Sequence, residues 1–345
     1  MPPDELPDTE GLMSSQLPPS ARSVIDFFSR ALLSFRSSSF KLQVICTAAP
    51  HDFNDGPRAP LPPCDRPQTL IVLDSSFNPP TRAHLRMATS AAHDLTQKEG
   101  QKLDALRLLL LLAVNNADKG AKPAAFDKRL AMMWAFARDV QQSIREESKS
   151  AAREADGEEH GVRAEDGLSI DLALTTAPFF HEKSTLLAEA SFYNPENSAG
   201  QTEQLFLVGY DTLTRIFNPK YYPPLTSASQ LAMAAESTPM QQALGPFFDR
   251  AKLRVTMRTD DEWGGEREQR AYLEDLLQAE GLTKVGGTKE WGSRIEMVEG
   301  QEVWADVVSS TFARAAAREG NGERLGRMVT PGVRWLIERQ MLYAE

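Results

Sequence analysis

The stretch of sequence that decides the fold is LIVLDSSFNPPTRAH, residues 70–84. Its four leading apolar residues predict a buried strand that ends at Leu73, and Asp74–Pro80 has the turn-forming residues of a tight loop. From Thr81 onward the apolar residues recur at helical spacing. The stretch therefore predicts a strand, a tight loop and a helix in succession.

Such a unit can bind an anion at the start of its helix. The first-turn amide groups have no partner inside the helix, and the helix dipole places positive potential there. Thr81 and His84 are three residues apart, so both would lie on one face of that turn. An ordinary strand-to-helix corner, with Thr81 as a cap and His84 exposed, is the alternative. Spacing alone does not separate the two.

The composition limits the classes of partner. The chain has 345 residues, a formal net charge of −10, and 41% hydrophobic and 8% aromatic residues. This length suits one large α/β domain or two modest ones. The acidic balance argues against general affinity for nucleic acid or anionic membrane, so an anionic ligand needs a local basic pocket. Two cysteines, Cys46 and Cys64, provide neither metal-site spacing nor a disulfide framework.

Several features bear on the cellular location. The first residues, MPPDELPD, are acidic and Pro-rich, unlike a secretory or mitochondrial leader. No apolar run reaches the roughly 20 residues that a membrane span needs. Together with the low cysteine content, these features predict a soluble protein of the cytoplasm or nucleus, with no membrane partner.

The chain divides into an extension and a main domain. Residues 1–67 read as a disordered Pro- and acid-rich start, one amphipathic helix after Ser20, and a Pro-rich linker, with a short strand pattern at 41–46. Residues 68–345 form the main domain. Charged residues and alanine dominate from residue 141, which predicts a frayed helix end and then a disordered insertion near 144–167.

A second strand supports a parallel sheet. Residues 106–114 are almost continuously apolar, which is typical of a central strand covered on both faces. A polar loop with Lys119 and Lys122 follows at the carboxyl end of this strand, where open α/β sheets bind their ligands. Each lysine is a candidate phosphate ligand, and simple solvation in a loop is the alternative for either one.

The residues Ser76–His84, SFNPPTRAH, resemble the first motif of the HIGH-type nucleotidyltransferases, especially the nicotinamide mononucleotide (NMN) adenylyltransferases. That motif runs Gly-Ser/Thr-Phe-Asn-Pro-x-His/Thr-x-x-His. This chain has Ser75 where the family usually has Gly, and Thr81 where many members have His. Its long N-terminal extension is typical of divergent eukaryotic, fungal-type members.

A second match lies near the C-terminus. Residues 307–314, VVSSTFAR, resemble the family's Ile-Ser-Ser-Thr-x-x-Arg motif. Ser309 or Ser310 is positioned to cap the helix that follows, and the planar fork of Arg314 suits phosphate oxygens. A Ser-Ser-Thr cap with a following Arg is common in helices, but its co-occurrence with the first motif in the family's order favours the functional interpretation. Residues 328–343 also resemble the family's terminal helix.

The resemblance covers residues 70–344 and implies a Rossmann-like parallel sheet with helices on both faces. By analogy, ATP would lie across two helix N-termini, and His84 with Thr81 beside it would contact the phosphates as charge develops during transfer. Mg²⁺ would bridge phosphate oxygens through water and ligand, without a protein metal cage. A Gly-x-Asp turn at 209–211 resembles the family's turn beside the nucleotide, although a capping Asp is the alternative. The implied nucleotide-binding residues are Ser76, Phe77, Asn78, Lys119, Lys122, Gly209, Asp211, Ser310, Thr311 and Arg314.

The segment expected to bind the acceptor substrate differs from the family pattern. Relatives supply a Trp that stacks on the nicotinamide ring, whereas residues 175–183 contain none, and Phe179 or Phe180 would provide the flat surface. The implied reaction is transfer of AMP from ATP to NMN, which yields NAD and pyrophosphate. One alternative is transfer of AMP or CMP to another phosphorylated acceptor. A second is an ATP-binding or slowly ATP-hydrolysing regulatory protein, and an oligomer is compatible with each.

Overall fold

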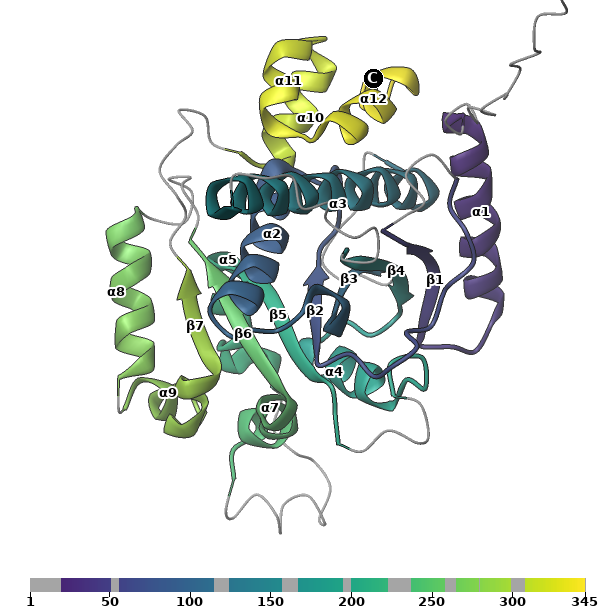
Figure 1. Cartoon of the computed structure of the whole chain (residues 1–345). Helices are drawn as coiled ribbons and strands as arrows, with labels where there is room; N and C mark the ends of the chain where they lie inside the picture. Colours follow the sequence, from purple (N-terminus) through teal and green to yellow (C-terminus); the bar gives the residue numbers. More distant parts are fainter. Residues whose placement is uncertain are drawn as a thin grey trace, which may run out of the picture.

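The computed structural model describes residues 20–50, 56–114, 124–156, 167–194, 200–222, 237–257, 265–278, 280–298 and 308–344. Within these ranges a seven-stranded sheet occupies the centre of the molecule (Figure 1). The predicted strand of the deciding stretch is its fourth strand in spatial order. The strands are β1 Leu42–Ala48, β2 Thr69–Asp74, β3 Leu106–Ala113, β4 Ser169–Thr175, β5 Glu203–Gly209, β6 Ala251–Thr256 and β7 Ile295–Val298.

Helices cover both faces of the sheet. The described α-helices are α1 Ala21–Ser37, α2 Arg82–Gln97, α3 Phe126–Asp156, α4 Phe180–Glu189, α5 Tyr210–Ile216, α7 Pro239–Arg250, α8 Glu266–Leu277, α9 Gly281–Lys284, α10 Ser310–Arg318, α11 Gly322–Met328 and α12 Pro331–Arg339. Short 3-10 turns lie at Leu103–Ala105, Pro219–Tyr221 and Lys289–Arg294. None of the helices in the described ranges has the length and apolarity to cross a membrane.

The strand order places a topological switch point beside β2. The order is β1-β4-β3-β2-β5-β6-β7, and strands β2 to β7 are parallel to their neighbours while β1 runs antiparallel to β4. From β2 the chain builds outward through β3 and β4, and then returns to add β5, β6 and β7 on the other side. Open α/β sheets bind ligands at the carboxyl ends of their strands at such a reversal. The predicted α/β class, with a mostly parallel sheet between helices, is confirmed.

Successive side chains of each strand point to opposite faces of the sheet and so contribute to two separate hydrophobic cores. Ile71 and Leu73 of β2 belong to the core shared with α1, α2, α3 and the C-terminal helices, whereas Leu70 and Val72 belong to the core shared with α4, α5 and α7. Residues 108–112 of β3 are at most 1% exposed, because both faces of this strand are covered. The continuous apolar run of β3 is thereby explained.

The N-terminal extension contributes to the same sheet through β1. Arg107 of β3 donates from Nε to Asp171 Oδ2 of β4 at 2.7 Å, and the Thr47 hydroxyl of β1 donates to Asp171 Oδ1 at 2.6 Å. Tyr193 also donates to this carboxylate at 3.1 Å. These groups are buried, so the carboxylate and the guanidinium compensate each other's desolvation. Helix α1 packs against α3 on the opposite face of the sheet, in the core that contains Ile71 and Leu73.

Two helix boundaries differ from the sequence-based expectation. Helix α3 continues to Asp156, so the first part of the charged segment predicted as an insertion is helical. Its Ala, Glu, Lys and Arg residues are good helix formers, which explains the continuation. The residue pattern predicts a helix from Ser184 or Thr185, but α4 begins earlier, at Phe180. It also predicts a short helix at 231–235, and this segment lies outside the described residues, as does the predicted disordered start.

Candidate active site

The site lies where β2, β3 and β5 end. The register pairs Leu73 of β2 with Leu207 of β5, and Asp74 with Leu111 of β3. The loop after β2 therefore leaves the sheet between the ends of two neighbouring strands. It carries the chain into α2, whose N-cap residue is Thr81. The predicted succession of strand, loop and helix is confirmed, and it stands at the switch point.

Three hydrogen-bonding groups lie against the ring of His84. The Thr81 backbone N–H donates to His84 Nδ1 at 3.1 Å, and Thr81 Oγ1 lies 2.8 Å from the same nitrogen. On the other side of the ring, Ser75 Oγ lies 3.0 Å from Nε2. A backbone N–H can only donate, so Nδ1 accepts and, in the neutral ring, Nε2 carries the hydrogen. The structure thus places Thr81 and His84 on one face of the first turn, as their spacing predicts.

Phe77 and Asn78 support the loop from inside. Phe77 is fully buried with φ 45°, and its ring centroid lies 5.7 Å from that of His84. Asn78 is 4% exposed, and its Oδ1 accepts a 2.8 Å hydrogen bond from the Tyr343 hydroxyl. Both side chains are buried in the protein interior. Phe77 and Asn78 could therefore contact a ligand only through backbone atoms. Ser76, which belongs to the same loop, is half-buried.

The second motif contacts the first directly. Ser309 is the N-cap of α10, and its hydroxyl accepts from the Phe312 N–H at 3.3 Å. The Ser310 hydroxyl donates to the Pro79 carbonyl at 2.8 Å, and Arg314 Nη1 donates to the Asn78 carbonyl at 2.8 Å. These partners are more than 230 residues apart in the chain. The N-terminus of α10 is thereby fixed beside the loop that precedes α2.

Arg314 also orders the start of its own helix. Its Nη2 donates to the hydroxyl of Thr311 at 3.2 Å, and Thr311 itself is exposed. The guanidinium therefore bridges the loop of the first motif and the first turn of α10. A cation and a helix N-terminus together make this corner favourable for phosphate oxygens.

Gly209 in the turn after β5 leaves room for the carboxylate of Asp211. A Cβ at Gly209 would lie 2.9 Å from Asp211 Oδ1, so this carboxylate would have to move. Gly209 is the N-cap of α5, and Asp211 in its first turn forms an ion pair with Arg215 at 3.6 Å. The structure places this turn at the same sheet edge as the β2 loop. Asp211 lies in the first turn of α5, where an acidic residue stabilises a helix. This structural role is compatible with a ligand contact by the same carboxylate.

The segment after β4 presents one exposed aromatic ring. Phe179 is 39% exposed and stacks on His181 with 5.6 Å between centroids and 8° between planes. Phe180 packs inward on Phe206 at 5.7 Å. Burial lowers the pKa of His181, although Glu182 opposes this shift. Of the two predicted stacking residues, Phe179 therefore has the more accessible face.

Sequence reasoning missed a buried ion pair at this edge. Lys183 of α4 donates to Asp74 at the end of β2, and its Nζ lies 5.2 Å from the centre of the Phe180 ring. Both charged side chains are less than 10% exposed. The pair joins the segment after β4 to the segment after β2. A Lys one turn into a helix carries no local signal for this partner, which is 109 residues away.

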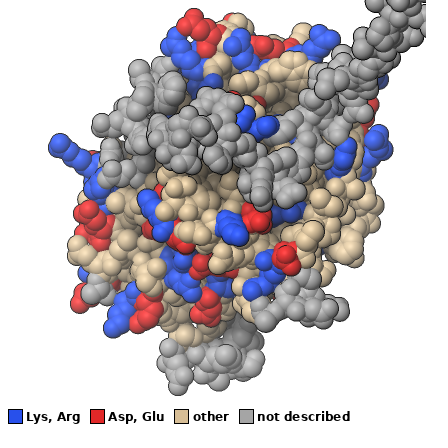
Figure 2. Space-filling model, in the orientation of Figure 1, with Lys and Arg blue, Asp and Glu red and all other residues tan. Residues whose placement is uncertain are grey.

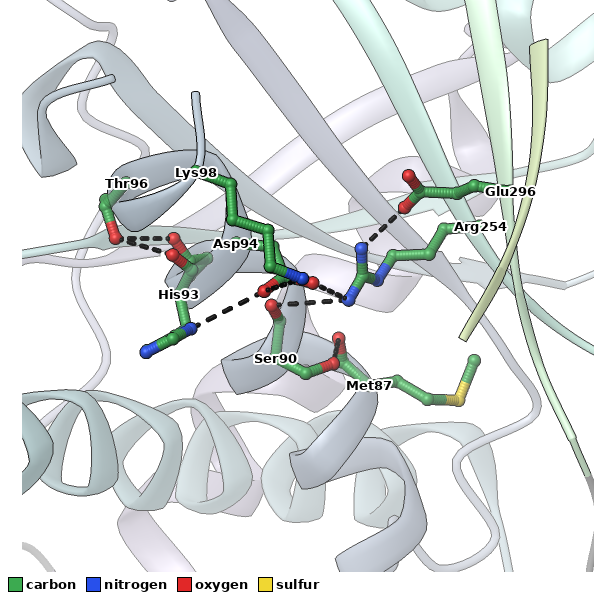
Figure 3. Close-up of polar contacts among 9 residues, drawn as sticks. Met87, Ser90, His93, Asp94, Thr96, Lys98, Arg254 and Glu296 are labelled. Atoms are coloured by element: carbon green, nitrogen blue, oxygen red, sulfur yellow. Dashed lines mark hydrogen bonds and ion pairs between the residues drawn. The ribbon is translucent and has the colours of Figure 1, made fainter. Parts of the chain in front are cut away.

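A second charged cluster anchors the far half of α2 (Figure 3). Arg254 of β6 donates to Asp94 at 2.6 Å and to Glu296 of β7 at 2.5 Å, and its side chain is 5% exposed. Lys98 approaches Asp94 at 3.0 Å. Burial by itself raises the pKa of Asp94, but the hydrogen bonds from Arg254 and Lys98 outweigh it and the net shift is downward. The helix that carries His84 is thus tied to the sheet at both ends.

Two predicted phosphate ligands, Lys119 and Lys122, lie outside the described residues. Among the residues that are described, no group of three or more His, Cys, Asp or Glu side chains could hold a metal ion. The face seen in Figure 2 intersperses Lys and Arg with Asp and Glu. The chain as a whole is acidic, so the positive charge at the site comes from single side chains such as Arg314 and Lys183.

Comparison with known proteins adds a curated relative. No protein-family model matches the chain. A Schizosaccharomyces pombe protein named "Putative nicotinamide mononucleotide adenylyltransferase" is 29% identical over 265 residues, which make up 77% of this chain and 81% of that protein.

Solved structures give weaker matches. Plasmodium falciparum nicotinic acid mononucleotide adenylyltransferase, complexed with NaAD or with APC, is 12% and 11% identical, with TM-scores of 0.41 and 0.42. Each match covers 80% of this chain and 98% of that one. At these scores the likeness adds nothing to what the strand order already shows.

Proposed function

We propose that this chain, a homologue of the NMN adenylyltransferase-like nucleotidyltransferases, transfers AMP from ATP to a phosphorylated mononucleotide. The Schizosaccharomyces pombe relative confirms the family resemblance that the first motif carries. Its printed name makes NMN the first acceptor to test, with NAD and pyrophosphate as the products.

The observation that carries the proposal is the contact between the two motifs. Ser310 and Arg314 donate to carbonyls of the loop that precedes His84, so two helix N-termini converge at the switch point. A triphosphate needs several N–H and cationic donors within a few ångströms of one another. This corner is the one place in the described residues where both motifs and a reversal of strand order coincide.

The chemistry requires positioning and charge stabilisation rather than a covalent intermediate. An oxygen of the acceptor phosphate attacks the α-phosphorus in line, a P–O bond forms, and the bond to the bridging oxygen of pyrophosphate breaks. The Nε2–H of His84, which faces the Ser75 hydroxyl, adds positive potential beside the phosphates as negative charge grows, and the first-turn amides of α2 act in the same sense. Arg314 and Thr311 contribute donors at the start of α10.

Mg²⁺ belongs to this proposal as a companion of ATP. Two carboxylates, Asp74 and Asp211, lie at the sheet edge, and both already face cations of the protein. This donor set suits a metal held mainly by phosphate oxygens and water. When bound, Mg²⁺ would neutralise charge on the phosphates.

The test is a product analysis with ATP, Mg²⁺ and NMN. We expect NAD and pyrophosphate in equal amounts, and a control without NMN that consumes no ATP. Formation of ADP and phosphate without NAD would reject adenylyl transfer and favour the ATP-hydrolysing alternative.

A second acceptor class is favoured by the exposed phenyl ring of Phe179, which lies in the segment where the family resemblance implies a Trp. A phenyl ring offers a smaller stacking surface and selects less strongly among flat bases. Parallel assays with NMN, nicotinic acid mononucleotide, and purine and pyrimidine mononucleotides decide this point. A higher kcat/KM for an acceptor other than NMN would assign the chain to that acceptor.

A further inference from the structure

Ser75 occupies the position that is usually glycine in the related first motifs, and here it carries a hydroxyl into the site. Its backbone is compatible with a side chain, because the described non-glycine residues with positive φ are Phe77, Met341 and Tyr343. Its N–H donates to the Leu111 carbonyl of β3 at 3.3 Å. The side chain therefore stands at the edge of the sheet with a fixed backbone, one residue beyond β2.

The hydrogen-bond directions around His84 determine what Ser75 can do. Because the Thr81 N–H donates to Nδ1, the neutral ring carries its hydrogen on Nε2 and donates it to Ser75 Oγ over 3.0 Å. A hydroxyl that accepts one hydrogen bond still has its own hydrogen to donate. A hydroxyl polarised in this way is also a stronger donor, since linked hydrogen bonds reinforce one another.

Resting on the proposed adenylyl transfer, we propose that Ser75 is a further substrate-contacting residue of this enzyme. Its hydroxyl accepts from His84 Nε2 and donates its own hydrogen to a phosphate oxygen of ATP. His84 then acts on the phosphate through Ser75, whereas a glycine at this position would leave the ring to make the contact alone. No covalent step is involved, and no proton leaves either residue.

Two observations favour this role over simple support of the ring. Thr81 already fixes the ring orientation with two contacts at Nδ1, so a third group is not needed for orientation. Ser75 is also only half-buried, unlike the supporting residues Phe77 and Asn78 beside it.

The experiment compares Ser75→Ala, Ser75→Thr, His84→Ala and the Ser75→Ala/His84→Ala double variant. We expect Ser75→Ala to lower kcat/KM for ATP by about 100-fold, the lower end of the range lost with one donor to developing charge. Ser75→Thr keeps the hydroxyl and should retain activity within about fivefold. The double variant should be no worse than His84→Ala by more than about twofold, because the two residues act as one unit.

Ser90→Ala, which removes a hydroxyl from α2 outside the site, is the matched control and should leave kcat/KM unchanged. A Ser75→Ala variant with unaltered kcat/KM, or one whose loss adds fully to that of His84→Ala, would overturn the proposal. Calorimetric measurement of ATP affinity distinguishes a failure of the Ser75 proposal from a failure of the proposed adenylyl transfer. If the wild-type protein makes no dinucleotide, adenylyl transfer fails, while weaker ATP binding by Ser75→Ala still supports the contact and equal binding overturns it.

Discussion

Two halves of the sheet edge differ in how their side chains are held. The half that we propose to bind the nucleotide consists of Ser75–His84 and Ser309–Arg314, and its groups are fixed by hydrogen bonds to one another and to backbone carbonyls. The acceptor half, Thr175–Lys183, presents a partly exposed ring stacked on His181 and one buried ion pair. Polar bonds fix position to a fraction of an ångström, whereas stacking tolerates sliding. Under the proposed function, hydrogen bonds therefore hold the groups that face ATP, whereas a partly exposed ring faces the acceptor.

The largest expected effect comes from removing His84 in the nucleotide half. His84→Ala should lower kcat by about 10²- to 10⁴-fold, because a donor to developing charge is lost. The Kd for ATP should change by less than about threefold. Steady-state kinetics and calorimetry measure the two quantities, with His93→Ala, an exposed histidine on the same helix, as the control. Unchanged turnover would remove His84 from the mechanism.

Arg314→Met should affect both stability and ATP binding. It leaves the Asn78 carbonyl without its charged donor, which costs on the order of 1.5 kcal/mol of unfolding free energy. We also expect KM for ATP to rise at least about tenfold, since the bridge between the two motifs is lost. Arg318→Met, on the same helix but exposed, should change neither quantity. If urea unfolding and KM respond equally to both substitutions, the two motifs do not form one unit.

A smaller effect is expected from Phe179→Ala in the acceptor half. Stacking of an aromatic ring contributes about 0.5–1.5 kcal/mol, so KM for the acceptor should rise by about 2- to 10-fold. KM for ATP should stay constant. Phe40→Ala, which removes another exposed ring, serves as the control. Should Phe179→Ala raise KM for ATP instead, the division into two halves would be wrong.

The smallest effect concerns the anchor of α2 and depends on pH. The pKa of Asp94 is lowered below its ordinary 3.8, so its ionised form stabilises the fold above that pH and this contribution is lost as pH falls through the lowered value. Asp94→Asn should cost about 1 kcal/mol at pH 7, and the cost should shrink below pH 4. Urea unfolding at pH 7, 5, 4 and 3 measures it. A cost that stays constant or grows toward pH 3 would contradict the assignment.

Local patterns were sufficient to predict the parts of the fold that depend on neighbouring residues. The β2 strand, the α2 N-cap at Thr81 and a cap at Ser309 or Ser310 follow from turn chemistry and periodicity within about ten residues, and the structure assigns the last cap to Ser309. The apolar run of β3 predicted a strand covered on both faces for the same reason.

Long-range polar contacts could not be predicted in this way. Arg107 pairs with Asp171, 64 residues away, and Lys183 pairs with Asp74, 109 residues away. The local sequence around each cation gives no indication of its partner. The same holds for Arg314, whose motif suggested a phosphate ligand but whose guanidinium also holds the Asn78 carbonyl. Helix α3 beyond residue 144 was misjudged because a charged, Ala-rich segment has the composition both of a helix and of a disordered insertion.

The most direct measurement of the central claim follows the α-phosphorus of ATP. The protein is incubated with ATP labelled at that atom, Mg²⁺ and NMN, and the labelled products are separated. We expect the label to appear in NAD, with one pyrophosphate released for each NAD formed, and His84→Ala to lower this transfer by about 10²- to 10⁴-fold. Label recovered in ADP, with none in a dinucleotide, would contradict adenylyl transfer at this site.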